Sequence, residues 1–330
     1  MKRITIIGTG YVGLVSGAGI SEFGHHVTCC DIDRDKIKEL KSGHIPIYER
    51  GLESLVKQNV TKGRLYFSWD VHKAIQDSEI IFIAVGTPQG NDGESDLGAV
   101  ESVTKTIGEN LNGYKIICTK STVPVGTGKW IEDIIRTIQP KADFDYVSNP
   151  EFLREGAAIK DFMHPDRVVI GTRTSKALDI MREVYRALYI NETPILSTSV
   201  ETAEMIKYAS NSFLALKISY INEIANLCEA VGADVHQVAK AMGLDGRISP
   251  KFLHPGPGFG GSCFPKDTEA LAATGHKNNS PLPTIEAAIK TNVSQKTRML
   301  GKLKRLVSDF NGKTIAVLGL AFKPQTDDVR

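Results

Sequence analysis

One cysteine lies in a setting suited to covalent chemistry. Cys263 belongs to the run GFGGSCFPKD at positions 258–267, and four glycines fall between positions 256 and 261. Pro265 suits the first turn of a helix beginning at about Cys263, which places the thiol at a positive helix end beside Lys266. Both features favour the thiolate, the reactive form of cysteine. The glycine-rich approach favours a nucleophile over a small structural cysteine.

Polar groups elsewhere can serve such a nucleophile. Asp267 lies four residues after Cys263, on the same face of the first turn, where it can position a water or accept a proton. The run from Glu201 to about Gly232 has no glycine or proline until its end and predicts one long helix. Lys207 and Asn211 share a stripe of that helix with Leu214, Ile218, Ile221 and Ala225. Two polar groups on a buried stripe need partners.

A dinucleotide fingerprint opens the chain. GTGYVG at positions 8–13 follows a predicted strand and precedes a helical stretch. Gly8 permits the tight turn, Gly10 lets the backbone approach a pyrophosphate, and Gly13 allows close helix packing. Asp31 ends the second predicted strand, at the distance expected for the acid that binds the ribose hydroxyls. Its charge favours NAD over NADP, although the nearby Arg34 and Lys36 weaken that preference.

The elements that position these groups form an α/β pattern. Over the first 170 residues, short β-branched runs alternate with helical stretches, which predicts a Rossmann-type parallel sheet covered by helices on both faces. The predicted strands are 4–8, 27–31, 80–85, 115–119 and 167–171. The segments 121–124 and 149–155 follow strands, and in such folds these positions line the ligand crevice.

Composition narrows the function classes. The 40 Lys and Arg residues nearly balance the 38 Asp and Glu residues, so nothing points to a nucleic-acid or membrane surface. An anionic ligand must therefore be held by local charges. The five cysteines, an odd number spread through the chain, favour free thiols in a reducing compartment over a disulfide framework, and we expect a cytoplasmic protein. No CxxC pair or His/Cys cluster suggests a metal site.

Three domains are expected. Residues 1–200 form the NAD-binding domain, 201–300 a central helical domain with the cysteine loop, and 301–330 a linker and the beginning of a further α/β domain. A basic linker helix is predicted around 291–305, and a strand over 314–318. A single strand cannot bury its own faces, so we expect the native protein to be longer or only partly represented here.

With these residues assembled, the chain resembles the UDP-glucose/GDP-mannose dehydrogenase family, and within it the UDP-glucose 6-dehydrogenase branch. The resemblance covers residues 1–330. Besides the motifs above, it is carried by VGTP at 85–88, STVPVGT at 121–127, NPEFLREG at 149–156 and LGLAFKP at 318–324. It implies a homodimer built by the central helix, a UDP-binding C-terminal domain, and oxidation of UDP-glucose to UDP-glucuronate by two NAD through a thioester on Cys263.

The resemblance also implies roles for single residues. Cys263 would be the nucleophile, Lys207 and Asn211 would stabilise an oxyanion, Asp267 would handle protons, and Glu151 and Thr122 would organise the hydrolytic water. The implied cofactor contacts are Gly8, Gly10, Tyr11, Val12, Gly13, Asp31, Lys36, Thr87, Thr122, Glu155, Lys266 and Arg330. The implied sugar-nucleotide contacts are Glu151, Phe152, Leu153, Arg154, Lys207, Asn211, Phe252, Leu253, His254, Pro255, Gly256, Gly260 and Lys323, with Arg247 reaching across from a second subunit. His254 departs from relatives that have lysine there.

Other functions are compatible with these residues. GDP-mannose or UDP-N-acetylhexosamine 6-dehydrogenases share the same chemistry. A two-electron dehydrogenase of small hydroxy acids can share the Rossmann domain and the lysine–asparagine pair, but it has no need of Cys263. A non-catalytic NAD-binding regulator would leave Cys263, Lys207 and Asp267 free to be structural.

Overall fold

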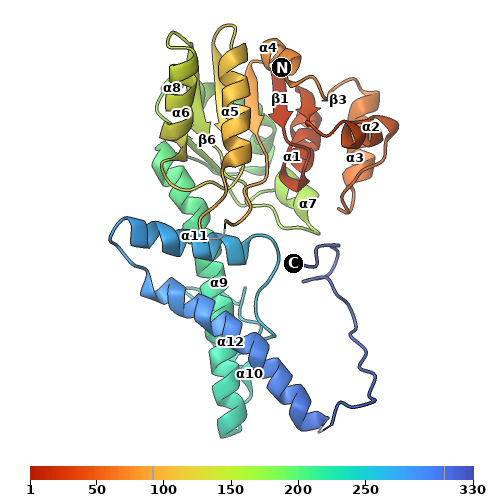
Figure 1. The fold of residues 1–330 in the computed structure, drawn as a ribbon, viewed down its shortest axis with the longest axis vertical. Helices are drawn as coiled ribbons and strands as arrows, with labels where there is room; N and C mark the ends of the chain where they lie inside the picture. Colours follow the sequence, from red (N-terminus) through yellow and green to blue (C-terminus); the bar gives the residue numbers. More distant parts are fainter. Residues whose placement is uncertain (91–92, 308) are drawn as a thin grey trace. The chain divides into compact units, whose positions relative to one another are not determined.

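The computed structural model describes residues 1–90, 93–307 and 309–330 of the chain (Figure 1). The chain divides into two units. The first comprises Met1–Pro88, Ser95–Lys207 and Pro324–Thr326, and the second comprises Gln89–Glu94, Tyr208–Lys323 and Asp327–Arg330.

The first unit is built on an eight-stranded sheet with the strand order β3-β2-β1-β4-β5-β6-β7-β8. The strands are β1 Arg3–Ile7, β2 His26–Cys30, β3 Leu65–Ser68, β4 Ile80–Ile83, β5 Lys115–Thr119, β6 Phe144–Ser148, β7 Val168–Thr172 and β8 Ile195–Thr198. All five predicted strands are present, with ends that differ by at most two residues. The order reverses between β1 and β4, and that reversal is where open α/β sheets bind dinucleotides.

One strand pair departs from the expected parallel sheet. β6 and β7 are antiparallel, with Ser148 opposite Gly171, whereas every other neighbouring pair is parallel. A parallel neighbour requires a crossover that returns the chain to the starting edge. The connection from β6 to β7 instead leaves and re-enters at the same edge of the sheet. Its first residues are the motif NPEFLREG.

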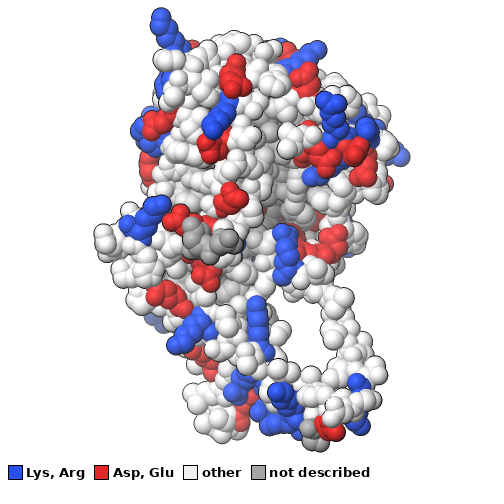
Figure 2. All heavy atoms as spheres, viewed as in Figure 1, with Lys and Arg blue, Asp and Glu red and all other residues white. Residues whose placement is uncertain are grey.

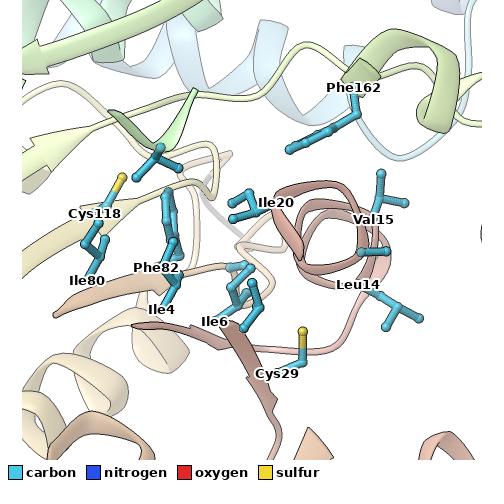
Figure 3. Packing of buried hydrophobic residues seen from close by; sticks show 14 of the residues in the cluster. Ile4, Ile6, Leu14, Val15, Ile20, Cys29, Ile80, Phe82, Cys118 and Phe162 are labelled. Carbon is cyan, nitrogen blue, oxygen red and sulfur yellow. The ribbon is translucent and has the colours of Figure 1, made fainter. Parts of the chain in front are cut away.

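The helices of the first unit cover both faces of the sheet. Alternate residues of the central strands point to opposite sides: Ile4, Ile6 and Phe82 join one hydrophobic cluster, and Ile7 and Ile83 join the other. Figure 3 shows Ile20 of α1 facing Ile6 and Phe82 within the first cluster, to which Leu14 of the same helix also belongs. Strands buried on both faces explain the unbroken apolar runs in the sequence.

The helical bounds are as follows. The first unit contains α1 Tyr11–Glu22, α2 Arg34–Ser42, α3 Leu52–Thr61, α4 Val71–Asp77, α5 Gly98–Asn110, α6 Thr127–Ile138, α7 Ala158–Met163, α8 Ser175–Val184 and the 3-10 helix Arg186–Asn191. The long helix α9 covers Val200–Val231, close to its predicted limits, and the division between the units falls within it. The second unit adds α10 Val235–Gly243, α11 Phe264–Lys277 and α12 Pro283–Leu306.

Two expectations for the C-terminal part need correction. The helix predicted around 291–305 begins earlier, at Pro283, because proline suits the first turn of a helix. The strand predicted over 314–318 is absent: these residues have no regular secondary structure and are exposed. A strand needs a neighbouring strand for its backbone hydrogen bonds, and the described residues of this unit provide none at that place.

The charges on the surface and the apolar character of the helices bear on whether the protein binds nucleic acid or membranes. On the face shown in Figure 2, side chains of both charge signs are interspersed, as the near-balanced composition predicts. Among the described residues, no helix combines the length and the apolar character needed to cross a membrane.

Candidate active site

The glycine motif adopts the geometry that a dinucleotide turn requires. Gly8 has φ +103°, and a Cβ there would lie 2.6 Å from the Ala84 carbonyl oxygen. A Cβ on Gly13 would lie 1.9 Å from the Gly8 carbonyl oxygen, so the first turn of α1 packs directly on the loop. Gly10, the residue that precedes α1, has no atom within 4 Å of its Cβ position. That open backbone suits the close approach of a phosphate.

Asp31 is held next to this loop. Its carboxylate accepts hydrogen bonds from the Thr9 amide at 2.9 Å and from the Thr9 hydroxyl at 2.7 Å, and Lys36 Nζ lies 3.6 Å away. Burial acts to raise the pKa of Asp31, but the Thr9 and Asp33 hydrogen bonds and the charge of Lys36 outweigh it, so the pKa lies below its ordinary value. Thr9 was not predicted, because it occupies a variable position of the fingerprint.

Two further predicted residues meet beyond the carboxyl ends of β4 and β5. The Thr87 hydroxyl donates to the Thr122 carbonyl oxygen at 2.8 Å. Ser121 Oγ donates to the Val85 carbonyl oxygen at 2.6 Å, which fastens the same two loops a second time. Since β1, β4 and β5 are neighbours, their loops share one edge of the sheet with the glycine motif.

The motif NPEFLREG continues this edge. The buried Glu151 carboxylate accepts from the Leu153 amide at 2.7 Å, and Leu153 packs against the hydrophobic core. The Phe152 ring lies 3.6 Å from the Arg167 guanidinium carbon and 5.2 Å from Lys207 Nζ. Arg154 is committed to Asp161, with Nη2 to Oδ1 at 2.6 Å, so its guanidinium already has a carboxylate partner. Glu155 accepts from the Thr326 hydroxyl at 3.3 Å.

A buried lysine beneath this motif was not anticipated. Lys120 Nζ donates to Asn149 Oδ1 at 3.2 Å, and Tyr185 Oη donates to the same oxygen at 2.5 Å. Burial lowers the pKa of Lys120, and the nearby Glu151 charge acts against that shift. Its position directly after β5, before the STVP run, is the signal by which sequence could have found it.

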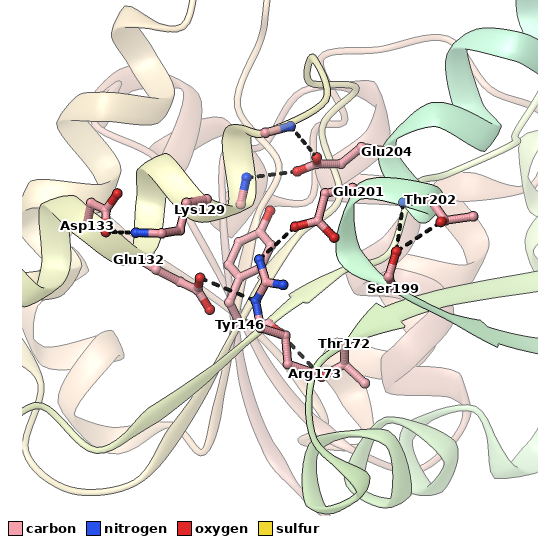
Figure 4. A network of polar contacts seen from close by, with 12 residues as sticks. Lys129, Glu132, Asp133, Tyr146, Thr172, Arg173, Ser199, Glu201, Thr202 and Glu204 are labelled. Carbon is pink, nitrogen blue, oxygen red and sulfur yellow. Dashed lines mark hydrogen bonds and ion pairs between the residues drawn. The ribbon is translucent and has the colours of Figure 1, made fainter.

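Glu204 of α9 fastens the loop that carries Thr122. Its carboxylate accepts from the amides of Gly126 at 2.7 Å and Gly128 at 2.8 Å, at the start of α6. Burial raises the pKa of Glu204 to about 7, while those two hydrogen bonds act to lower it. Figure 4 shows the surrounding network, in which Arg173 pairs with Glu201 at 2.8 Å. Glu204 was not predicted either.

In the second unit, the structure brings four predicted residues together. Asp267 is buried, and its carboxylate accepts from Asn211 Nδ2 at 2.6 Å and pairs with Lys266 Nζ at 2.6 Å. Cys263 precedes the first residue of α11 and is exposed, and its carbonyl oxygen accepts from the Asp267 amide at 2.9 Å. The thiol thus lies one turn from a buried carboxylate, and Ser262 Oγ lies 3.6 Å from its sulfur.

Buried amide side chains hold the loop that leads to Cys263. Asn292 Oδ1 accepts from the Phe259 amide at 2.7 Å, and Asn292 Nδ2 donates to the Phe259 carbonyl oxygen at 3.0 Å. Asn222 and Gln295 do the same for Gly256, at 2.8 and 2.9 Å. A Cβ on Gly258 would lie 2.5 Å from Asn292 Oδ1, so this glycine is required by the clamp itself.

The remaining predicted residues of the second unit are placed individually. Arg247 is exposed and pairs with Asp245 at 2.6 Å. Phe252 has φ +66° and its ring lies 6.0 Å from that of Phe264, while Lys323 Nζ lies 5.3 Å from the Phe322 ring. Arg330 pairs with Asp328 at 2.9 Å, and its carbonyl oxygen accepts from the Gly261 amide. Leu253 is buried, His254 is exposed, Pro255 is partly exposed, and a Cβ on Gly260 would lie 3.3 Å from the Arg330 carbonyl oxygen.

The described part of the chain has no cluster of three or more His, Cys, Asp or Glu residues that could hold a metal ion. None of the five cysteines forms a disulfide, and Cys263 alone is exposed among them.

Comparisons with known proteins agree with the arrangement. Residues 2–189 match the NAD binding domain of the UDP-glucose/GDP-mannose dehydrogenase family, and residues 201–294 match its central domain. The UDP-glucose 6-dehydrogenase TuaD of Bacillus subtilis (strain 168) is 55% identical over 100% of this chain and 71% of its own length. The UDP-glucose 6-dehydrogenase of Rhizobium meliloti (strain 1021) is 54% identical over 99% of this chain and 76% of its own length.

A solved structure gives the same result for the fold. The UDP-glucose dehydrogenase from the archaeon Pyrobaculum islandicum superposes with a TM-score of 0.97 at 38% identity, covering 100% of this chain and 77% of that one. Taken with the glycine turn, Asp31 and the cysteine loop, these matches establish that the chain belongs to the UDP-glucose/GDP-mannose dehydrogenase family, whose members are NAD-dependent oxidoreductases.

Proposed function

We propose that this protein oxidises UDP-glucose to UDP-glucuronate in two NAD-dependent steps, through a thioester on Cys263. The observation that carries the proposal is the exposed thiol at the start of α11, one turn before the buried pair of Asp267 and Asn211. The names of the two relatives at 55% and 54% identity support the substrate. NAD supplies the hydride acceptor for both steps when it is bound.

The first oxidation removes a hydride from carbon 6 of the sugar, and a base reached through Asp267 takes the hydroxyl proton to leave an aldehyde. The Cys263 thiolate then adds to the aldehyde carbon and forms a hemithioacetal. Loss of a second hydride and of the hydroxyl proton gives the thioester. Water adds to the thioester carbon and displaces the thiolate, so the products are a carboxylate and the original cysteine.

The polar and charged side chains have complementary tasks in this scheme. Lys207 and Asn211 stabilise negative charge on the sugar oxygen, because donors fixed in a buried site need no reorganisation during the reaction. Glu151 and Thr122 order the water for hydrolysis. Asp31 binds the ribose hydroxyls, and its negative charge, held by Thr9 and Lys36, disfavours a ribose phosphate.

The remaining ligand contacts belong to the proposal as well. The cofactor is contacted by Gly8, Gly10, Tyr11, Val12, Gly13, Lys36, Thr87, Thr122, Glu155, Lys266 and Arg330. The sugar nucleotide is contacted by residues 151–154, 252–256, Gly260 and Lys323. Residues 1–200, 201–300 and 301–330 act as cofactor domain, central domain and linker to a UDP-binding part.

The active form is proposed to be a cytoplasmic homodimer joined through α9. Phe213, Tyr220 and Leu227 lie seven residues apart on that helix and are 60%, 45% and 59% exposed. Apolar side chains at this spacing share one face and favour a second helix as partner. Arg247 would then reach the site of the other subunit. Sedimentation of a Phe213→Glu variant should give a monomer.

The decisive measurement is the yield of NADH per sugar with limiting UDP-glucose, with GDP-mannose and UDP-N-acetylglucosamine alongside. Two NADH per UDP-glucose and a carboxylate product are expected. One NADH would mean that oxidation stops at the aldehyde and that the role of Cys263 is wrong. Turnover with another sugar nucleotide alone would keep the mechanism and reject the substrate.

A further inference from the structure

Glu49 is a buried carboxylate that the proposed mechanism does not use. It lies in the loop between α2 and α3 and is 6% exposed. A carboxylate is rarely buried unless its oxygens receive hydrogen bonds, because its desolvation is costly. The partners of Glu49 therefore indicate why it is there.

Those partners come from two separate segments, one at the start of α1 and one leading into α7. Glu49 Oε2 accepts hydrogen bonds from the Tyr11 hydroxyl and from the Gly156 amide, the latter at 2.7 Å. Glu49 Oε1 accepts from the Ala158 amide at 2.9 Å. The Gly156 amide also lies 3.1 Å from the Tyr11 hydroxyl oxygen, which closes a triangle of contacts. All four residues belong to the first unit.

The two loops are the ones to which the proposed function assigns the two ligands. Tyr11 is the fourth residue of the fingerprint GTGYVG, and Gly156 ends NPEFLREG. In the sequence they are 145 residues apart. We propose that Glu49 is a positioning residue that locks the cofactor loop to residues 151–156, of which residues 151–154 are proposed to contact the sugar nucleotide, so that a shift of one loop displaces the other. This inference rests on the proposed function for the identity of the ligands.

The chemistry of the contact favours a carboxylate over any other side chain of its size. An ionised carboxylate only accepts hydrogen bonds, and here it meets three donors. A glutamine would present one NH₂ group to a donor, leaving at least one of the buried amides without an acceptor. Burial and the hydrogen bond to Glu49 raise the pKa of Tyr11 above its ordinary value, so its hydroxyl stays protonated and donates.

The first test compares Glu49→Gln with Glu22→Gln. Glu22, at the other end of α1, accepts from Arg64 Nη2 at 2.9 Å and Asn59 Nδ2 at 3.0 Å and touches neither loop. We expect Glu49→Gln to lower kcat/KM for UDP-glucose roughly ten- to hundredfold, the effect of losing a hydrogen bond to a charged group. Glu22→Gln should stay within about twofold of the wild type, as surface losses usually do. Equal kinetics for both variants would overturn the proposal.

The second test uses a substitution confined to the cofactor loop. Tyr11→Phe removes one donor and leaves the amide contacts of Glu49 in place, so we expect this variant to fold. It can therefore test the proposal even if Glu49→Gln fails to fold. Amide hydrogen exchange in residues 151–158, measured without ligands, should be faster than in the wild type, and KM for UDP-glucose should rise. Adding Tyr11→Phe to Glu49→Gln should have little further effect, because the lock is then already broken.

Two outcomes would reject the lock. Unchanged exchange in residues 151–158 of Tyr11→Phe would show that the loops are not connected. Fully additive kinetic effects of Tyr11→Phe and Glu49→Gln would show that they act separately. The exchange measurement needs no substrate, so if the wild type fails to turn over UDP-glucose, the proposed function fails and the lock is still decided by exchange.

Discussion

The cofactor loops of the first unit and the cysteine loop of the second unit are held in place by different means. The glycine turn is fixed by backbone packing: Gly13 leaves no room for a Cβ against the Gly8 carbonyl, and Gly8 lies against Ala84 of the neighbouring strand end. Among the described residues of the second unit, no strand forms a sheet with the cysteine loop. Buried amide side chains of α9 and α12, among them Asn292 and Gln295, hold its backbone instead.

Because of this difference, the position of the glycine turn should tolerate less change than the position of the cysteine loop. A loop at the end of a parallel strand inherits its position from the hydrogen-bond ladder of the whole sheet. A loop clamped by amide side chains depends on a few hydrogen bonds, each worth about 1 kcal/mol net, but costly if one partner is left unpaired. We therefore expect substitutions at the cysteine loop to change chemistry, and substitutions at the glycine turn to change stability together with NAD binding.

The largest expected effect is at Cys263. Cys263→Ser should lower carboxylate formation roughly 10³-fold or more, because the nucleophile is lost, while NADH affinity stays near that of the wild type. Product analysis by mass spectrometry and an NADH titration measure the two quantities. Cys228→Ser, a buried free thiol on α9, is the matched control and should keep two NADH per sugar. If Cys263→Ser formed uronic acid at the wild-type rate, the expectation that substitutions at the cysteine loop change the chemistry would be wrong.

Asn211 gives the next effect. Asn211→Ala removes the 2.6 Å hydrogen bond to Asp267 and a donor to the proposed oxyanion. Loss of such a donor costs roughly 2.7 to 4 kcal/mol of transition-state stabilisation, or about 10²- to 10³-fold in kcat. Asn226→Ala on the same helix loses a hydrogen bond to Gln295 and should change kcat far less. Similar kcat values for both variants, from steady-state rates at saturating substrates, would contradict the assignment.

Two alanine substitutions in the glycine turn differ in the room available for the added Cβ atom. Gly13→Ala places a Cβ 1.9 Å from a carbonyl oxygen, so it should destabilise the fold by about 3 kcal/mol and abolish NAD binding. Gly10→Ala meets no atom within 4 Å and should fold normally, with weaker NAD binding alone. Urea unfolding and NADH titration test both. A stable Gly13→Ala protein would mean that the turn adapts more easily than backbone packing allows.

The smallest effect concerns pH. The pKa of Glu204 is raised to about 7 by burial, so the folded state binds a proton more tightly than the unfolded chain, where the value is near 4.5. The stability contributed by protonated Glu204 is complete below about pH 4.5 and is lost as the pH rises through 7. From pH 5 to 8 the wild type should lose about 2 kcal/mol of unfolding free energy that Glu204→Gln does not lose. Parallel urea curves at each pH measure this, and the same pH dependence in both proteins would show that Glu204 does not titrate there.

Much of the first unit was predictable from local rules. Apolar runs of strand length, the glycine fingerprint and Asp31 are short-range patterns with one structural solution, and the long helix from Glu201 was predicted because no glycine or proline interrupts it. The antiparallel β7 was not predicted. Strand direction depends on where a connection re-enters the sheet, and no residue type within Val168–Thr172 encodes that.

The buried polar partners were also missed, for a related reason. Glu49, Lys120 and Glu204 read as ordinary surface charges because their donors or acceptors lie far away in the sequence. Glu49 reaches Gly156 across 107 residues, and Glu204 reaches Gly126 across 78. The sequence predicted that Asn211 needs a partner, because it is a polar group on a buried helical stripe. That this partner is Asp267 is shown only by the fold.

The order of the strands has a kinetic consequence. Ile4 pairs with Val27, 23 residues later, and with Ile80, 76 residues later (80 − 4), so the pairing of β1 with β4 closes the longer loop. The extra closure entropy is about 1 kcal/mol, and contacts distant in sequence form slowly. The contact of Ala84 with the Gly8 turn therefore forms late in folding. A nascent chain of about 70 residues, although it contains the fingerprint and Asp31, should not yet bind a dinucleotide.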